Sequence, residues 1–240
     1  MGKCLQGRSI GGSGPHIDHR YFYLDSESRG RYSCGLARQA ITEFLRQHAE
    51  ESIFLGSDWY NTLEAFKNNP SVIGFTVEQI VISKIASAGL HSGNVQLPPA
   101  KNFPFDDNFV RLSKDRPPTY YVPLRFNQKT IDALFVSVDQ KKKTAYLVPI
   151  QITVAKQHKD SESAFFADLP IWLLGLEDFK VKVTFVWIHD GERGRAQVKE
   201  KLKALRSRTV LINPDYEVLW VDIAQVDVEL ANTLARIDMF

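Results

Sequence analysis

Long apolar runs, cysteine and excess charge are all scarce in this sequence. No stretch approaches the ~20 apolar residues of a transmembrane helix, and the first twenty residues lack the apolar region of a signal peptide. The two cysteines, Cys4 and Cys34, are not spaced as metal ligands, which argues against a structural zinc site and favours a reducing compartment. The net charge of +2 gives no global argument for or against nucleic acid. We therefore expect no membrane partner.

The apolar content is sufficient for one globular core. The chain has 240 residues, of which 44% are hydrophobic. Residues 1–35 are rich in glycine, serine and arginine, so we expect a flexible N-terminal arm or linker there. Residues 36–70 show helical spacing of apolar residues and are expected to form a helical extension. Residues 71–240 are then the main domain.

The order of expected elements is typical of an α/β fold. Apolar periodicity predicts helices at 74–89, 161–179, 191–208 and 227–237, with Pro170 kinking or dividing the second. It predicts strands at 119–126, 181–188 and 216–223, and two more within 130–159. Residues 91–118 contain several prolines and are expected to form loops. This order indicates a mixed central sheet flanked by helices on both faces.

Residues 130–159 have the most informative pattern, two apolar strands joined by a lysine-rich turn. The second strand is expected to bury one face in the core, because its alternate residues are apolar: Tyr146, Val148, Ile150, Ile152 and Val154. Gln151 and Thr153 then stand together on the opposite face. If the two strands pair as a hairpin, Asp132 can lie near both of them.

An aspartate beside two polar groups on the next strand has two interpretations. A carboxylate with neighbouring oxygen ligands suits a hard cation such as Mg²⁺, which polarises a phosphodiester and activates a water molecule. Alternatively, Asp132 caps a strand end, and Gln151 and Thr153 face solvent on the open side of a sheet. The spacing alone does not decide between them.

Glu78 lies within the apolar arc of the helix expected at 74–89. A buried carboxylate is costly unless it is paired, hydrogen-bonded or bound to a metal, so Glu78 is a candidate ligand. The alternative places Glu78 in the first turn of the helix, where a negative charge interacts favourably with the helix dipole.

Four short motifs together resemble one family. They are Gly74-x-x-x-Glu78, Ile131-Asp132-Ala133-Leu134, Gln151-x-Thr153 and the following His158. The combination resembles the restriction-endonuclease-like superfamily, PD-(D/E)XK, and is similar to the C-terminal domain of Crinkler effectors and retrotransposon hot spot proteins. The resemblance covers about residues 74–186 and implies a restriction-endonuclease-like core.

The resemblance also implies roles for individual residues. Asp132, Gln151 and Glu78 would hold Mg²⁺ or Mn²⁺, and Thr153 would stand where the superfamily has a lysine. That lysine normally offsets charge that develops at phosphorus, which Thr153 cannot do. Lys156, His158 or Lys159 could then assist, with His158 as a proton shuttle or a phosphate contact.

Basic residues are the candidate contacts to nucleic acid. Those expected to contact phosphates are Lys141, Lys142, Lys143, Lys159, Arg193, Arg195, Lys199 and Lys203. For the basic segment at 191–208, a solvated helix is the alternative interpretation.

The expected function is a metal-dependent nuclease that hydrolyses phosphodiester bonds of DNA, with RNA as an alternative target. Two other functions on the same fold are a catalytically inactive nucleic-acid-binding module and a module that interacts with host nuclear proteins. The resemblance implies action in the nucleus, the host nucleus for a secreted effector, or elsewhere inside the cell. Proteins of the family that the motifs resemble carry an upstream ATPase module. No phosphate-binding loop motif occurs within the 240 residues of this chain.

Overall fold

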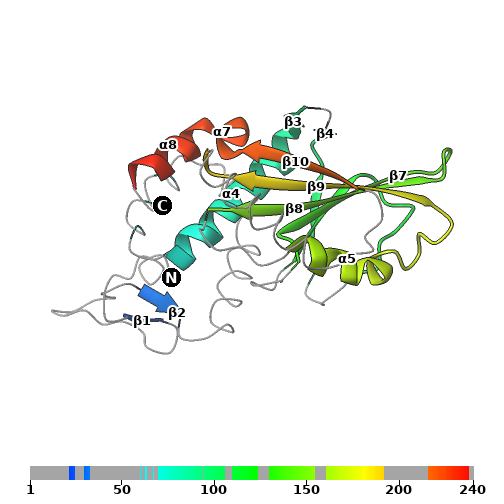
Figure 1. The fold of residues 1–240 in the computed structure, drawn as a ribbon, viewed down its shortest axis with the longest axis horizontal. Helices are drawn as coiled ribbons and strands as arrows, with labels where there is room; N and C mark the ends of the chain where they lie inside the picture. Colours follow the sequence, from blue (N-terminus) through cyan, green and yellow to red (C-terminus); the bar gives the residue numbers. More distant parts are fainter. Residues whose placement is uncertain are drawn as a thin grey trace.

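The computed structural model describes residues 22–24, 30–32, 60, 63, 67, 70–93, 95–105, 110–123, 130–154, 161–191 and 216–237. These residues form an α/β structure built on a six-stranded mixed sheet with helices on both faces (Figure 1). The expected fold class is therefore confirmed. Within the described residues, no helix is both long and apolar enough to cross a membrane.

The sheet has the strand order β10-β9-β8-β7-β6-β5. Strands β8, β9 and β10 are parallel to one another, as are β5 and β6, while β7 pairs antiparallel with both β6 and β8. The strands have the bounds β5 Lys101–Phe105, β6 Thr119–Pro123, β7 Ala133–Asp139, β8 Thr144–Thr153, β9 Lys180–His189 and β10 Glu217–Asp222. β7 and β8 are thus the expected hairpin, and its lysine-rich turn lies at the end of the sheet away from α8 (Figure 1).

One face of the sheet is covered by α4 (Pro70–Ala88), α7 (Ile223–Val226) and α8 (Val228–Arg236). Their apolar side chains share one core with Val148, Ile150 and Ile152 of β8. α4 ends at Gly89, which has a φ of +80° and whose N–H donates to the Ile85 carbonyl at 2.8 Å. A side chain at position 89 would meet the Leu97 carbonyl at 2.5 Å, so glycine is required there.

The opposite face is covered by α5 (Ser161–Trp172). Phe165, Leu169 and Trp172 of this helix pack in one core with Leu147 of β8 and Trp187 of β9. Because side chains alternate along β8, Gln151 and Thr153 point to this face, away from α4. Pro170 lies inside α5 without dividing it, and the helix ends two residues later rather than at Phe179.

Pro149 interrupts the hydrogen-bond ladder between β8 and β9 without inserting an extra residue into either strand. The offset between paired residues of β8 and β9 is the same before Pro149 (Leu147↔Val183) and after it (Ile150↔Val186). Proline lacks the N–H that a ladder needs, which explains the gap between these pairs. Pro149 therefore does not displace Gln151 by a bulge.

Several expectations were wrong. Residues 91–118 contain three strands, β3 (Leu90–Ser92), β4 (Val95–Leu97) and β5, where only loops were expected. Tyr146 is 37% exposed, although its strand face was expected to be core throughout. The closing helix expected at 227–237 is confirmed as α8, but a further short helix, α7, precedes it and was not expected. The ranges 36–51 and 192–208, both expected to be helical, lie outside the described residues.

The N-terminal region contains one short hairpin. β1 (Phe22–Leu24) pairs antiparallel with β2 (Gly30–Tyr32) within the range expected to be an arm or linker.

A buried aspartate joins the helices at the other end of the chain. Asp227 caps α8 by accepting the Leu230 N–H at 2.9 Å. It also accepts the Tyr60 hydroxyl at 2.5 Å and pairs with Lys84 of α4 at 3.2 Å. Burial by itself raises the pKa of Asp227, but the hydrogen bonds from Tyr60, Leu230 and Lys84 outweigh it and lower the pKa below its usual value.

Candidate metal site at the end of the β7–β8 hairpin

Asp132 and Gln151 meet directly where β7 begins. The Gln151 amide nitrogen Nε2 donates to Asp132 Oδ2 at 2.6 Å. The Ile152 backbone N–H donates to the same oxygen at 2.6 Å, and the Asp132 N–H donates to the Ile150 carbonyl at 2.9 Å. The antiparallel register, in which Ala133 pairs with Ile150, places residues 132 and 151 opposite each other. The hairpin thus brings together two of the three proposed ligands.

The Asp132 carboxyl is in an environment that disfavours its charge. Burial raises its pKa to about 7, and the hydrogen bond from the Ile152 N–H offsets this only in part. Among the residues that the structure describes, no lysine, arginine or histidine pairs with this carboxylate. A positive charge placed beside Asp132 would therefore be stabilising.

The structure combines the two interpretations of this pair. Asp132 does cap a strand end, because its side chain accepts the Ile152 N–H where β7 no longer continues alongside β8. Thr153, however, does not face solvent, since it is 3% exposed, and Gln151 is half-buried. Asp132 and Gln151 are therefore half-buried, and the sheet face that carries Gln151 and Thr153 is not fully solvated here.

Glu78 is half-buried in the middle of α4. α4 begins at Pro70 and has no acidic residue in its first turn, so the alternative that places Glu78 there is wrong. α4 packs on the face that carries Ile150 and Ile152, whereas Gln151 points to the other face. Convergence of Glu78 with Asp132 and Gln151 on one cation stays a prediction.

Thr153 is the first of a row of polar residues that lie side by side at the carboxyl ends of the parallel strands β8, β9 and β10. Thr153 of β8 pairs in register with His189 of β9, which pairs with Asp222 of β10. His189 is 3% exposed, and its Nδ1 lies 2.8 Å from the Gly191 carbonyl oxygen. Burial raises the pKa of Asp190, and the neighbouring Asp222 carboxylate raises it further.

The sequence held a signal for this row. His189 and Asp190 directly follow a strongly apolar strand, and the carboxyl ends of parallel strands are where α/β proteins bind ligands. Sequence reasoning recognised the strand and missed the two residues.

Glu162 is a third residue that the sequence pattern did not single out. It is 2% exposed on α5, where Oε1 accepts the Trp187 indole N–H at 2.8 Å and Oε2 accepts the Tyr216 hydroxyl at 2.6 Å. Trp187 pairs in register with Gln151, so Glu162 fixes α5 over the strand next to the Asp132–Gln151 pair. A glutamate in the first turn of a largely apolar helix was the available signal.

Comparisons with protein-family models, curated proteins and solved structures gave no match to this chain. Within the described residues, no group of three or more histidine, cysteine, aspartate and glutamate side chains could hold a metal ion. A cation here would be held by a carboxylate together with an amide oxygen.

The described lysines of the turn lie far from this pair. Lys141, Lys142 and Lys143 are exposed, and Lys142 forms an ion pair with Asp139 at 3.6 Å. β7 spans the seven residues between Asp132 and the turn, a separation of about 23 Å at ~3.3 Å per residue. The other basic or assisting candidates, Lys156, His158, Lys159, Arg193, Arg195, Lys199 and Lys203, lie outside the described residues.

Proposed function

We propose that this chain is a divalent-metal-dependent nuclease domain that hydrolyses phosphodiester bonds of DNA. The observation that carries the proposal is the contact between Asp132 and Gln151, which joins a carboxylate and an amide at 2.6 Å in a half-buried position. The motif resemblance and the hard-oxygen character of these two groups support Mg²⁺ or Mn²⁺ as the cation.

The residues fit such a cation in part. Asp132 supplies a half-buried carboxylate without a cationic partner among the described residues, and the Gln151 amide, which carries a carbonyl oxygen, lies beside it. A bound Mg²⁺ would supply Lewis-acid polarisation of the phosphate. Gln151 currently presents its nitrogen to Asp132, so holding the cation through Oε1 requires the amide to turn over.

The chain's own groups would have three roles in this reaction. Asp132 would hold the cation, and the Ile152 N–H fixes the carboxylate by its hydrogen bond. Gln151 would supply a second oxygen ligand. Thr153 is buried and uncharged, so it cannot supply the positive charge that the superfamily lysine provides.

The lack of charge on Thr153 favours a second candidate function, a nucleic-acid-binding module that does not cleave. The uncharged Thr153 at the lysine position removes one contribution to transition-state stabilisation. A domain with this site could bind a divalent cation and a phosphate without hydrolysing the ester.

A plasmid-nicking assay with Mg²⁺ distinguishes these functions. We expect Asp132→Ala to lower the nicking rate at least about a hundredfold, because a metal ligand contributes several kcal/mol to the transition state. Asp139→Ala is the matched control, since it removes a partly exposed aspartate from the other end of the same strand, and it should leave the rate unchanged.

Each outcome is informative. Equal nicking by the Asp132→Ala and wild-type proteins would rule out this site as the origin of the activity. Salt-dependent DNA binding by the wild type without nicking in Mg²⁺ or Mn²⁺ would establish the second candidate instead.

A further inference from the structure

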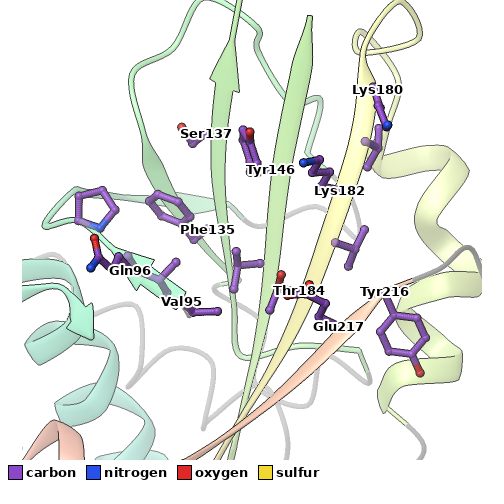
Figure 2. Close-up of a pocket in the computed structure, with 15 residues that line it drawn as sticks. Val95, Gln96, Phe135, Ser137, Tyr146, Lys180, Lys182, Thr184, Tyr216 and Glu217 are labelled. Atoms are coloured by element: carbon purple, nitrogen blue, oxygen red, sulfur yellow. The ribbon is translucent and has the colours of Figure 1, made fainter. Parts of the chain in front are cut away.

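The face of the sheet that α4 covers is open towards the β7–β8 turn. There Ser137 of β7, Tyr146 of β8 and Lys182 of β9 stand in register across three adjacent strands. Figure 2 shows these three side chains side by side on that face. Tyr146 is 37% exposed, which is unusual for an aromatic residue on a central strand.

A groove of about 880 Å³ runs over this open face. Its floor is formed by Phe135 and Val148, and residues 95–98, which include β4, form one wall. Lys180, Lys182 and the start of β10 at Glu217 lie on the other side (Figure 2). The volume lies within the range of roughly 300–1,000 Å³ that is usual for ligand sites. We call this region the Tyr146 groove.

The charges in and beside the groove are mostly positive. Lys180 and Lys182 line it against one carboxylate, that of Glu217. The Lys182 ammonium lies 5.7 Å from the centroid of the Tyr146 ring, so an aromatic face and a cation occupy neighbouring positions. The exposed lysines of the β7–β8 turn adjoin this end of the sheet.

We propose that the Tyr146 groove binds single-stranded nucleic acid, with a base stacked on Tyr146 and backbone phosphates contacted by Lys180 and Lys182. An aromatic ring beside lysines is the combination that recognises a strand with exposed bases. An acidic peptide would use the lysines but would gain little from the ring, and a duplex keeps its base faces inside the helix.

The groove is distinct from the Asp132–Gln151 site. Tyr146 and Gln151 are five residues apart on β8, about 17 Å at ~3.3 Å per residue, and their side chains point to opposite faces of the sheet. The proposal rests on the proposed function only for the class of polymer. Binding at the groove requires no metal and no cleavage.

Fluorescence anisotropy with a labelled oligo(dT) strand in EDTA tests this binding. We expect Tyr146→Ala to weaken binding about tenfold through lost stacking, and Tyr146→Phe to retain it. Lys180→Ala combined with Lys182→Ala should weaken binding and reduce the slope of log K against log salt by about 1.4, because two phosphate contacts are lost. Lys101→Ala, at an exposed lysine on the far edge strand β5, is the matched control and should bind as the wild type does.

Competitors decide the class of partner. An unlabelled strand of oligo(dT) or oligo(U) should displace the probe, and their ratio separates DNA from RNA. Equal displacement by poly-glutamate or by duplex DNA would overturn the proposal, as would wild-type affinity in the Tyr146→Ala and double-lysine variants. Absence of binding by the folded wild-type protein at low salt would also overturn it. Because EDTA prevents metal-dependent cleavage, none of these results depends on the nuclease proposal.

Discussion

Asp132, which is half-buried, and Asp227, which is buried, are two aspartates in similar hydrogen-bond environments. Each accepts one backbone N–H, from Ile152 or Leu230, and one side-chain donor, from Gln151 or Tyr60. They differ in charge compensation, because Lys84 pairs with Asp227 at 3.2 Å and no described residue does the same for Asp132.

The pKa values of the two carboxyls move in opposite directions accordingly. The pKa of Asp132 is raised to about 7 by burial, whereas that of Asp227 is lowered despite burial. Within one molecule, the comparison shows what a cation contributes to a buried carboxylate. It also indicates that an external cation would stabilise the charged form of Asp132.

The largest expected effect on stability is at Asp227, the aspartate that Lys84 neutralises. Asp227→Asn keeps a good helix cap but removes the charge that pairs with Lys84. We expect the free energy of unfolding at pH 7 to fall by about 2 kcal/mol, less than for a fully buried pair because Lys84 is 30% exposed. Urea denaturation measures this value.

The pH dependence of that loss is a further check. A lowered folded pKa stabilises the protein above the unfolded pKa of ~3.9 and ceases to do so as the pH falls through the folded value. The difference between Asp227→Asn and the wild type should therefore diminish below pH ~4. A difference that stayed constant into acid would mean that packing, not charge, is responsible.

Asp132→Asn should change stability in the opposite direction. Because the folded pKa of Asp132 is about 7, the wild type loses stability as the pH rises from ~4 to 7, and the asparagine variant does not. We expect the variant to equal the wild type at pH 4 and to exceed it by about 1 kcal/mol at pH 8, a value reduced for the half-buried position. A destabilised variant at pH 8 would show that a cation outside the described residues already compensates Asp132.

A divalent cation should substitute for the missing charge. At ten times its dissociation constant, Mg²⁺ would stabilise the wild type by about 1.4 kcal/mol at pH 8. The effect should be smaller at pH 5, where Asp132 is protonated, and absent in Asp132→Asn. Thermal denaturation with and without Mg²⁺ measures it, and an equal shift in both proteins would place the cation elsewhere.

The sequence could predict this hairpin because alternation along two apolar strands is a local pattern. The period of two placed Gln151 and Thr153 on one face of β8, and the assumed hairpin correctly brought Asp132 to Gln151. The exposure of Tyr146 could not be predicted this way, because it depends on where α4 ends above the sheet. The role of Glu162 likewise depends on Trp187 and Tyr216, which lie 25 and 54 residues away in the sequence.

The position of Glu78 within its helix could not be predicted from the sequence pattern either. Its position within an apolar arc was visible in the sequence, but the helix begins four residues earlier than expected, at Pro70. That shift moves Glu78 from near the first turn to the middle of the helix, where the dipole argument no longer applies. Helix boundaries depend on tertiary contacts more than helix existence does.

The smallest effect is expected at Asp139, a partly exposed aspartate that pairs with the exposed Lys142. Hydrogen bonds from the Lys142 N–H and the Lys142 charge lower the pKa of Asp139, but water surrounds the pair. Exposed ion pairs contribute little, because solvent screens them and ordering two side chains costs entropy. We therefore expect Asp139→Asn to leave the urea midpoint unchanged at pH 4 and pH 8, and to leave the Mg²⁺ response intact. If this variant shifted the midpoint as much as Asp227→Asn does, burial would not be what separates the aspartates, and the argument for a cation at Asp132 would lose its physical basis.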